Sequence, residues 1–151
     1  MKVLTDRVKA RRMNHDYYFE HLKGSWMGNS MMGFPLKTSS YGIYFLREPV
    51  GYFSNRWLTT ILVNPEETGG ISRDDIRTEL QRQNIESRPL WKPMHQQPLY
   101  LNYPYYGRGV SDRLFKYGLC LPSGSNMTNA DRLRVVNTIN SMLKPVSVKV
   151  K

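Results

Sequence analysis

The densest group of chemically capable side chains lies between residues 85 and 100, in IESRPLWKPMHQQPLY. This segment carries a guanidinium, an indole, an ammonium and an imidazole, contributed by Arg88, Trp91, Lys92 and His95. Arginine offers a planar fork for a carboxylate or phosphate, and histidine titrates near neutral pH. Prolines at three positions reduce the entropy lost when the segment is held in one shape. The segment is therefore either a rigid connector around a buried tryptophan or a binding loop for an acidic ligand.

Other kinds of site are poorly supported. Cys120 stands between two leucines in GLCLP, where a cysteine is usually a small buried hydrophobe with a raised pKa. The three histidines have no metal-ligand spacing with Cys120, and no glycine-rich phosphate loop occurs. The acidic pairs at 66–67 and 74–75 suit a loop and a helix start. We therefore expect no metal site and assign no catalytic residue.

The residue pattern predicts the elements that position this segment. Three- and four-residue steps through Leu4, Val8, Arg11 or Arg12, His15, and Phe19 or Leu22 predict a helix over 1–23, stopped by Gly24. Residues 24–40 are typical of an irregular insertion or linker. β-Branched and aromatic runs predict strands at 41–46, 56–63, 85–88 and 118–122, and Pro89 should end the third.

Three further helices have start signals. Ser72 and Asp75 have the spacing of a capping box, which opens a helix to about residue 84 that buries Ile76 and Leu80. Ser111 can cap a short helix over 112–117. Thr128 and Asp131 repeat the box and open a helix over 129–143. Its expected apolar stripe consists of Leu133, Val136, Ile139 and Leu143.

The order of these elements predicts an α+β fold, a small sheet with helices packed on one face. We expect four parts: a helix at 1–23, an insertion at 24–40, a domain at 41–144 and a tail at 145–151. The first helix or one sheet face should meet another domain or subunit.

Composition limits the class of protein. The chain has 151 residues, 40% of them hydrophobic, and one cysteine, which predicts a soluble cytoplasmic domain without a membrane span. Its net charge of +10 leaves open a basic module that binds nucleic acid or another polyanion. However, the basic residues are spread along the chain, and only RVKARR at 7–12 and the VKVK tail are clustered. Nucleic acid is therefore the alternative partner, and not the one we expect.

Three stretches resemble the DegT/DnrJ/StrS-type sugar aminotransferases: SNRWLTTILV, ISRDDIRTELQRQNIESRPLWKPMHQQP and LFKYGLCLPSGSNMTNADRLRVVNTI. The resemblance covers roughly residues 53–143 and is specific in order and spacing. VLTDRVKARRMNHDYYFEHL also resembles the long helix that joins the large and small domains of that family. Residues 24–40 do not match well. The amino-acid sequence of these stretches is most similar to that of enzymes that make UDP-linked amino-sugars for surface glycans.

The resemblance implies the small C-terminal domain of a fold-type I pyridoxal 5'-phosphate enzyme. Such enzymes transfer an amino group from glutamate to a nucleotide-linked keto-sugar, which we expect to be a UDP-4-keto-6-deoxy sugar used in polysaccharide biosynthesis. The family's Schiff-base lysine lies in the large domain, and Lys37 in FPLKTSS has the wrong neighbours to replace it. We therefore expect a fragment that holds no cofactor covalently. It should be inactive without the large domain or a companion aminotransferase chain.

The same resemblance implies the site. The segment matching SRPLWKPMHQQP lies at the family's domain cleft, so we expect Arg88, Trp91, Lys92 and His95 to help receive glutamate or the nucleotide-sugar. Asn55, in YFSNRW, should approach the same cleft. A chain without its large domain would leave apolar surface exposed, which predicts self-association.

Overall fold

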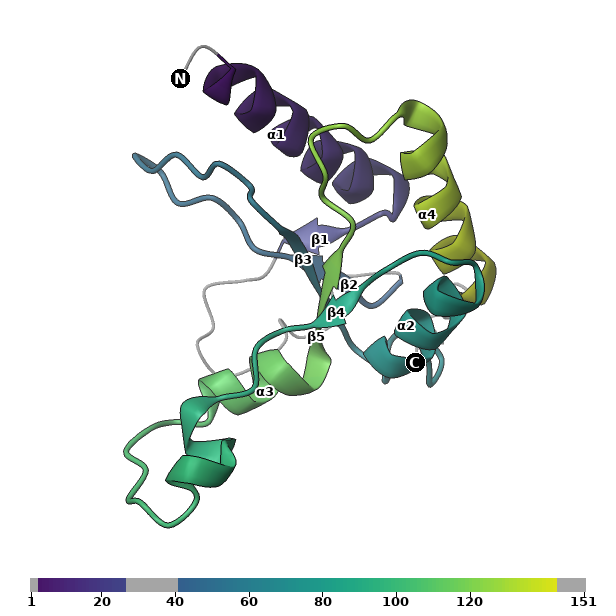
Figure 1. Ribbon diagram of the computed structural model, residues 1–151. Coiled ribbons are helices and arrows are strands. Elements are labelled where there is room, and N and C mark those ends of the chain that lie inside the picture. Colours follow the sequence, from purple (N-terminus) through teal and green to yellow (C-terminus); the bar gives the residue numbers. More distant parts are fainter. Residues whose placement is uncertain (1–2, 27–40, 144–151) are drawn as a thin grey trace, which may run out of the picture.

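The computed structural model describes residues 3–26 and 41–143, which form one sheet and four α-helices (Figure 1). The helices are α1 (Leu4–His21), α2 (Arg73–Arg82), α3 (Val110–Tyr117) and α4 (Asn129–Met142). The strands are β1 (Ser25–Trp26), β2 (Ile43–Phe45), β3 (Thr59–Val63), β4 (Arg88–Pro89) and β5 (Gly118–Leu121). Two single-turn 3-10 helices, Met94–Gln96 and Pro98–Tyr100, lie between β4 and α3.

The strands follow the order β1-β2-β3-β5-β4, and every neighbouring pair except the parallel β1 and β2 is antiparallel. The register places Arg88 opposite Cys120 and Cys120 opposite Thr60. Directly opposite residues project from the same face of a sheet. Arg88, Cys120 and Thr60 therefore share one face of the sheet.

The opposite face carries the core. Phe45, Ile61 and Leu119 lie on it side by side and are at most 1% exposed. They pack with buried side chains of α1, α2 and α4, including Tyr18 and Ile139. Full burial of a large apolar side chain stabilises a fold by about 1.5–3 kcal/mol. This packing confirms the predicted α+β arrangement.

Both predicted capping boxes are present. The Ser72 amide donates to Asp75 Oδ2 at 2.8 Å, and the Thr128 amide donates to Asp131 Oδ2 at 2.8 Å. The serine and threonine hydroxyls accept from the amides of the same two aspartates. Hydrogen bonds from the Ser72 hydroxyl and amide hold the pKa of the Asp75 carboxyl below its usual range, and those from the Thr128 amide and hydroxyl do the same for Asp131. Ile76 is fully buried, and so is Leu80 one turn later, as the sequence predicted.

The start of α3 and the buried face of α4 differ from the prediction. Gly109, at φ 67°, is the N-cap of α3 in place of Ser111, which lies inside the helix. In α4, Leu133 is 47% exposed, whereas Arg132 is only 4% exposed. Arg132 is buried because Asn14 of α1 accepts from it at 2.8 Å and Asn129 accepts a second hydrogen bond. The buried stripe therefore runs through Val135, Val136 and Ile139 instead of Leu133.

The strands are shorter than predicted. β2 stops at Phe45 and β3 starts at Thr59, because residues 46–58 form a long loop that bonds to α1. β4 ends at Pro89, as predicted, and Pro89 itself pairs with Leu119, which is possible because β4 is the edge strand and a proline there needs no donor. Ser25 and Trp26, expected in the irregular segment, pair with β2. The rest of that segment and the tail lie outside the described residues.

Helix α1 is buried only in its second half. It ends at His21, before the predicted stop at Gly24, and its buried residues are Asn14, His15 and Tyr18. Leu4, predicted on the packed face, is 59% exposed. In Figure 1 the start of α1 extends beyond the sheet, beside the 46–58 loop. None of the helices in the described ranges has both the length and the hydropathy that a membrane crossing needs.

Candidate functional site

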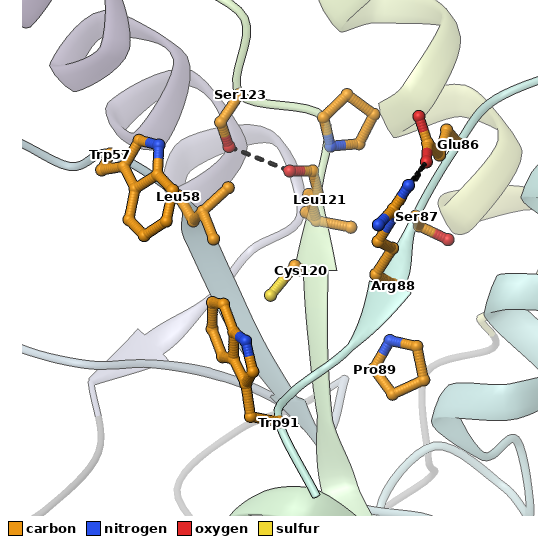
Figure 2. Close-up of a pocket in the computed structure, with 11 residues that line it drawn as sticks. Trp57, Leu58, Glu86, Ser87, Arg88, Pro89, Trp91, Cys120, Leu121 and Ser123 are labelled. Carbon is orange, nitrogen blue, oxygen red and sulfur yellow. Dashed lines mark hydrogen bonds and ion pairs between the residues drawn. The ribbon is translucent and has the colours of Figure 1, made fainter.

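A cleft of about 430 Å³ opens beside β4 and β5. Its walls come from three places in the chain: the end of the 46–58 loop, residues 86–91, and residues 120–123. Figure 2 shows Trp57 and Trp91 on one side and Arg88 on the other, with Cys120 between them. The volume lies in the range of about 300–1,000 Å³ that small-molecule sites occupy. The cleft is therefore large enough for an organic ligand.

The aromatic wall is formed by two tryptophans far apart in sequence. The ring centroids of Trp57 and Trp91 are 6.4 Å apart with an angle of 35° between the ring planes. Trp57 is 60% exposed and Trp91 is 67% exposed. The expected alternative of a buried connector tryptophan is therefore wrong for Trp91, which presents its indole to solvent.

Arg88 forms the charged end of the cleft. Its Nε and Nη2 atoms donate to Glu86 Oε1 at 2.8 and 2.6 Å. Both side chains are more than two-thirds exposed, so this ion pair contributes little to stability. A carboxylate or phosphate group of a ligand can therefore replace Glu86 as the partner of the Arg88 guanidinium.

Cys120 lies behind the tryptophans on the floor of the cleft. It is 7% exposed, and burial raises the pKa of its thiol. A buried thiol with a raised pKa is a poor nucleophile. The structure thus agrees with its predicted role as a small buried hydrophobe.

His95 and Lys92 lie outside the lining of the cleft. His95 places Nε2 at 2.7 Å from Asp112 Oδ1, and its ring stacks on Tyr105 with centroids 3.8 Å apart. The hydrogen bond from His95 holds the pKa of the Asp112 carboxyl below its usual range. Lys92 is exposed, and its carbonyl accepts from the side chain of Gln97 at 3.1 Å. In this structure His95 joins the 91–110 segment to α3 through Asp112 and packs against Tyr105.

Asn55 positions the cleft instead of lining it. Its Oδ1 accepts the backbone amide of Trp57 at 2.9 Å. Arg11 of α1 donates to the Trp57 carbonyl, and Arg12 donates to the Ser54 carbonyl. Two consecutive arginines of the helix therefore hold the loop that carries Trp57.

The basic segment 7–12 has internal partners. Besides its bond to Ser54, Arg12 pairs with Glu48, and Arg7 donates to Ser125 Oγ at 3.2 Å. Arginines committed to the protein's own loops are a weak surface for phosphate chains. Within the described residues no group of three His, Cys, Asp or Glu side chains is placed to hold a metal.

The geometry brings together only part of the predicted set. Arg88 and Trp91 line one cleft, Asn55 orders its rim, and Lys92 and His95 lie to one side. Reasoning from the sequence missed Trp57 and Glu86 as lining residues. The signal for Trp57 was present, since it closes the YFSNRW stretch that was expected near the cleft.

A family model decides what kind of protein carries this cleft. The model of the DegT/DnrJ/EryC1/StrS aminotransferase family matches residues 1–140. The chain belongs to this aminotransferase family. Cleft residues from Trp57 to Ser123 all fall within the matched range.

Known proteins agree with this assignment. EpsN of Bacillus subtilis (strain 168), named as a pyridoxal phosphate-dependent aminotransferase, is 45% identical over 112 residues, which are 72% of this chain and 28% of EpsN. The GDP-perosamine synthase of Escherichia coli O157:H7 is 28% identical over 94 residues, 62% of this chain and 24% of that protein. A DegT/DnrJ/EryC1/StrS aminotransferase structure from Brucella abortus superposes with a TM-score of 0.70 at 23% identity. The superposed part is 94% of this chain and 32% of the Brucella abortus chain, and the match establishes that the two share a fold.

This chain therefore spans about a third or less of the relatives it matches. Pyridoxal phosphate enzymes of this kind attach the cofactor to a lysine. In the ranges 3–26 and 41–143, every lysine (Lys9, Lys23, Lys92 and Lys116) is exposed, and none lines the cleft. Lys37 lies outside the described residues. The described side chains therefore do not fit covalent attachment of the cofactor.

Proposed function

We propose that this chain is the C-terminal, substrate-binding part of a sugar-nucleotide aminotransferase. The activity of the assembled enzyme is amino transfer from glutamate to a UDP-4-keto-6-deoxy sugar for surface-glycan biosynthesis. The observation that carries the proposal is the cleft at Trp57, Arg88 and Trp91 inside the stretch that matches the family model. A relative named for a GDP-linked sugar supports a nucleotide-sugar as the substrate class.

In this proposal each part of the cleft has its own task. Arg88 exchanges Glu86 for the carboxylate of glutamate or a phosphate of the nucleotide-sugar, since a guanidinium pairs with either through two parallel hydrogen bonds. Trp91 supplies an apolar face. Asn55 holds the backbone at Trp57. His95 braces the loop that carries Trp91, and Lys92 flanks it.

The chemistry itself belongs to the cofactor. Pyridoxal phosphate supplies an electron sink when it is bound. Because the described lysines are exposed and lie outside the cleft, we propose that this chain alone is catalytically silent. It acts with a large domain or a companion aminotransferase chain, and its substrates are bound between the two parts.

Two measurements on the purified chain test this function. Calorimetry should detect a UDP-sugar, with binding weakened in Arg88→Ala and unchanged in Arg82→Ala, an exposed arginine of α2. Incubation with pyridoxal phosphate should give no absorbance band that borohydride fixes to the protein. Absence of UDP-sugar binding, or a cofactor band fixed by reduction, would contradict the proposal.

Neither the comparisons nor the described residues 3–26 and 41–143 support the polyanion-binding alternative that the net charge of +10 left open. The matched proteins are aminotransferases, and the clustered arginines at 7, 11 and 12 have protein partners.

A further inference from the structure

Trp57 and Trp91 expose large indole surfaces that a folded chain normally covers. Each ring is more than half exposed, although both lie at the edge of an apolar cleft with Leu58 and Cys120 behind them. Exposed aromatic groups that converge in a hollow are typical of ligand sites. Packing of the core does not require them there, since neither belongs to the core cluster.

The backbone is anchored at Trp57 and next to Trp91. Trp57 is fixed through its amide by Asn55 and through its carbonyl by Arg11. Trp91 follows Leu90, whose amide donates to the Gly118 carbonyl at 3.3 Å. The Leu90 side chain lies so close over Gly118 that a Cβ there would be 2.0 Å from Leu90 Cδ1. Anchored backbones reduce the entropy that binding would otherwise cost.

The exposed indole faces suit a flat group. The two indoles form a wedge, tilted by 35°, whose centroids lie 6.4 Å apart. Contacting aromatic rings have centroids about 4.5–7 Å apart, so the two indoles contact each other, and a planar ring can stack on the solvent-exposed face of either one. Every nucleobase has such a face.

The positive charge of Arg88 indicates which second group the ligand carries. Arg88 stands at the far side from the tryptophans, and Glu86 is its exposed partner. A guanidinium in that place matches a phosphate group. The cleft thus combines a surface for a planar ring with a position for a phosphate, which is the chemistry of a nucleoside diphosphate.

We propose that Trp57 and Trp91 form the subsite for the nucleobase of the sugar nucleotide, with Arg88 facing its diphosphate. This inference rests on the proposed function and assigns the base-binding part of the same cleft. Pyridoxal phosphate also joins a planar ring to a phosphate, so the test must separate the two.

The test measures dissociation constants by calorimetry for UDP, uridine, inorganic pyrophosphate and pyridoxal phosphate. Wild-type chain should bind UDP more tightly than either uridine or pyrophosphate, and pyridoxal phosphate should not compete. Trp57→Ala and Trp91→Ala should each weaken UDP about tenfold or more, since stacking on one aromatic ring contributes on that scale. Trp91→Phe should recover part of the loss, while pyrophosphate affinity stays the same in all three variants.

Tyr106→Ala is the matched control, because Tyr106 is 91% exposed and does not line the cleft. It should bind UDP like the wild type, and thermal melts should show that every variant folds. A UDP-sugar that binds equally well to both tryptophan variants would overturn the nucleobase subsite and leave the proposed function intact. Tryptophan-dependent binding of pyridoxal phosphate in place of UDP would also overturn it. Failure of the wild-type chain to bind any nucleotide would remove both proposals.

Discussion

The guanidinium of Arg12 on α1 and the carboxylate of Glu48 face each other in a two-pronged ion pair, with N···O distances of 3.1 and 2.9 Å. Glu48 also accepts the backbone amide of Ser54, and the ring of Phe53 lies under Arg12 at 4.5 Å. The helix and the loop before β3 are therefore joined by one connected set of contacts. That loop, residues 46–58, carries Trp57 near its end, so the contacts of α1 bear on the shape of the cleft.

This pairing predicts a specific sensitivity to acid. The hydrogen bond from Arg12, followed by that from Ser54, lowers the pKa of Glu48 from its ordinary value of 4.5 to about 2. A carboxyl whose folded-state pKa is depressed stabilises the fold above its unfolded pKa, and this contribution is lost as the pH falls toward the folded value. Glu48→Gln should therefore lower the melting temperature at pH 7 and flatten its decline between about pH 4.5 and pH 2.

Glu66→Gln provides the control for this change, because Glu66 is an exposed carboxyl on the turn after β3. Its melting temperature should follow the wild-type pH curve. If Glu48→Gln gives a curve parallel to the wild type across the whole range, the ion pair does not hold the loop.

A buried arginine fastens α1 to α4. Arg132 is 4% exposed and donates to Asn14, which is fully buried. Arg132→Ala removes this donor and leaves a buried amide oxygen without it, which costs about 1–3 kcal/mol. Urea unfolding should show this loss, whereas Arg82→Ala, whose pair with Glu79 is on the surface, should change stability by less than about 0.5 kcal/mol. Equal effects in the two variants would show that burial of Arg132 is unimportant.

Gly118 of β5 is packed so closely that there is no room for a side chain between it and the loop that carries Trp91. A Cβ there would lie 2.3 Å from the Leu114 carbonyl oxygen as well as 2.0 Å from Leu90. Gly118→Ala should therefore destabilise the chain by about 1–3 kcal/mol, as overpacking does, and weaken UDP binding by displacing Trp91. Adding Leu90→Ala relieves only the side-chain clash, so the double variant should recover part of the stability. Wild-type melting of Gly118→Ala would refute this account of the contact.

Exposed apolar side chains on the 46–58 loop predict self-association of the isolated chain. Val50 is 95% exposed, Tyr52 76% and Phe53 73%, on a loop that α1 holds in place. Such patches mark protein interfaces or promote association. Light scattering should show a mass above that of the monomer, reduced toward it in Val50→Asp and unchanged in Tyr106→Ser. A monomer at millimolar concentration would contradict the prediction.

Local signals in the sequence predicted the elements whose causes are local. Ser72 with Asp75 and Thr128 with Asp131 give their helix starts directly, because both partners lie within four residues. Periodicity failed at Leu133 and Arg132, since the burial of Arg132 depends on Asn14, 118 residues away in sequence. The same limit applied at the site. Arg88 and Trp91 stood out as residue types, but the pairing of Trp91 with Trp57 depends on sheet register and on Arg11.

Amino transfer measured with and without the rest of the enzyme tests the central claim most directly. The chain is incubated with pyridoxal phosphate, glutamate and a UDP-4-keto-6-deoxy sugar, alone and together with the part of Bacillus subtilis EpsN that it does not match. We expect an amino-sugar product only in the mixture. Product formed by the 151-residue chain alone would contradict it.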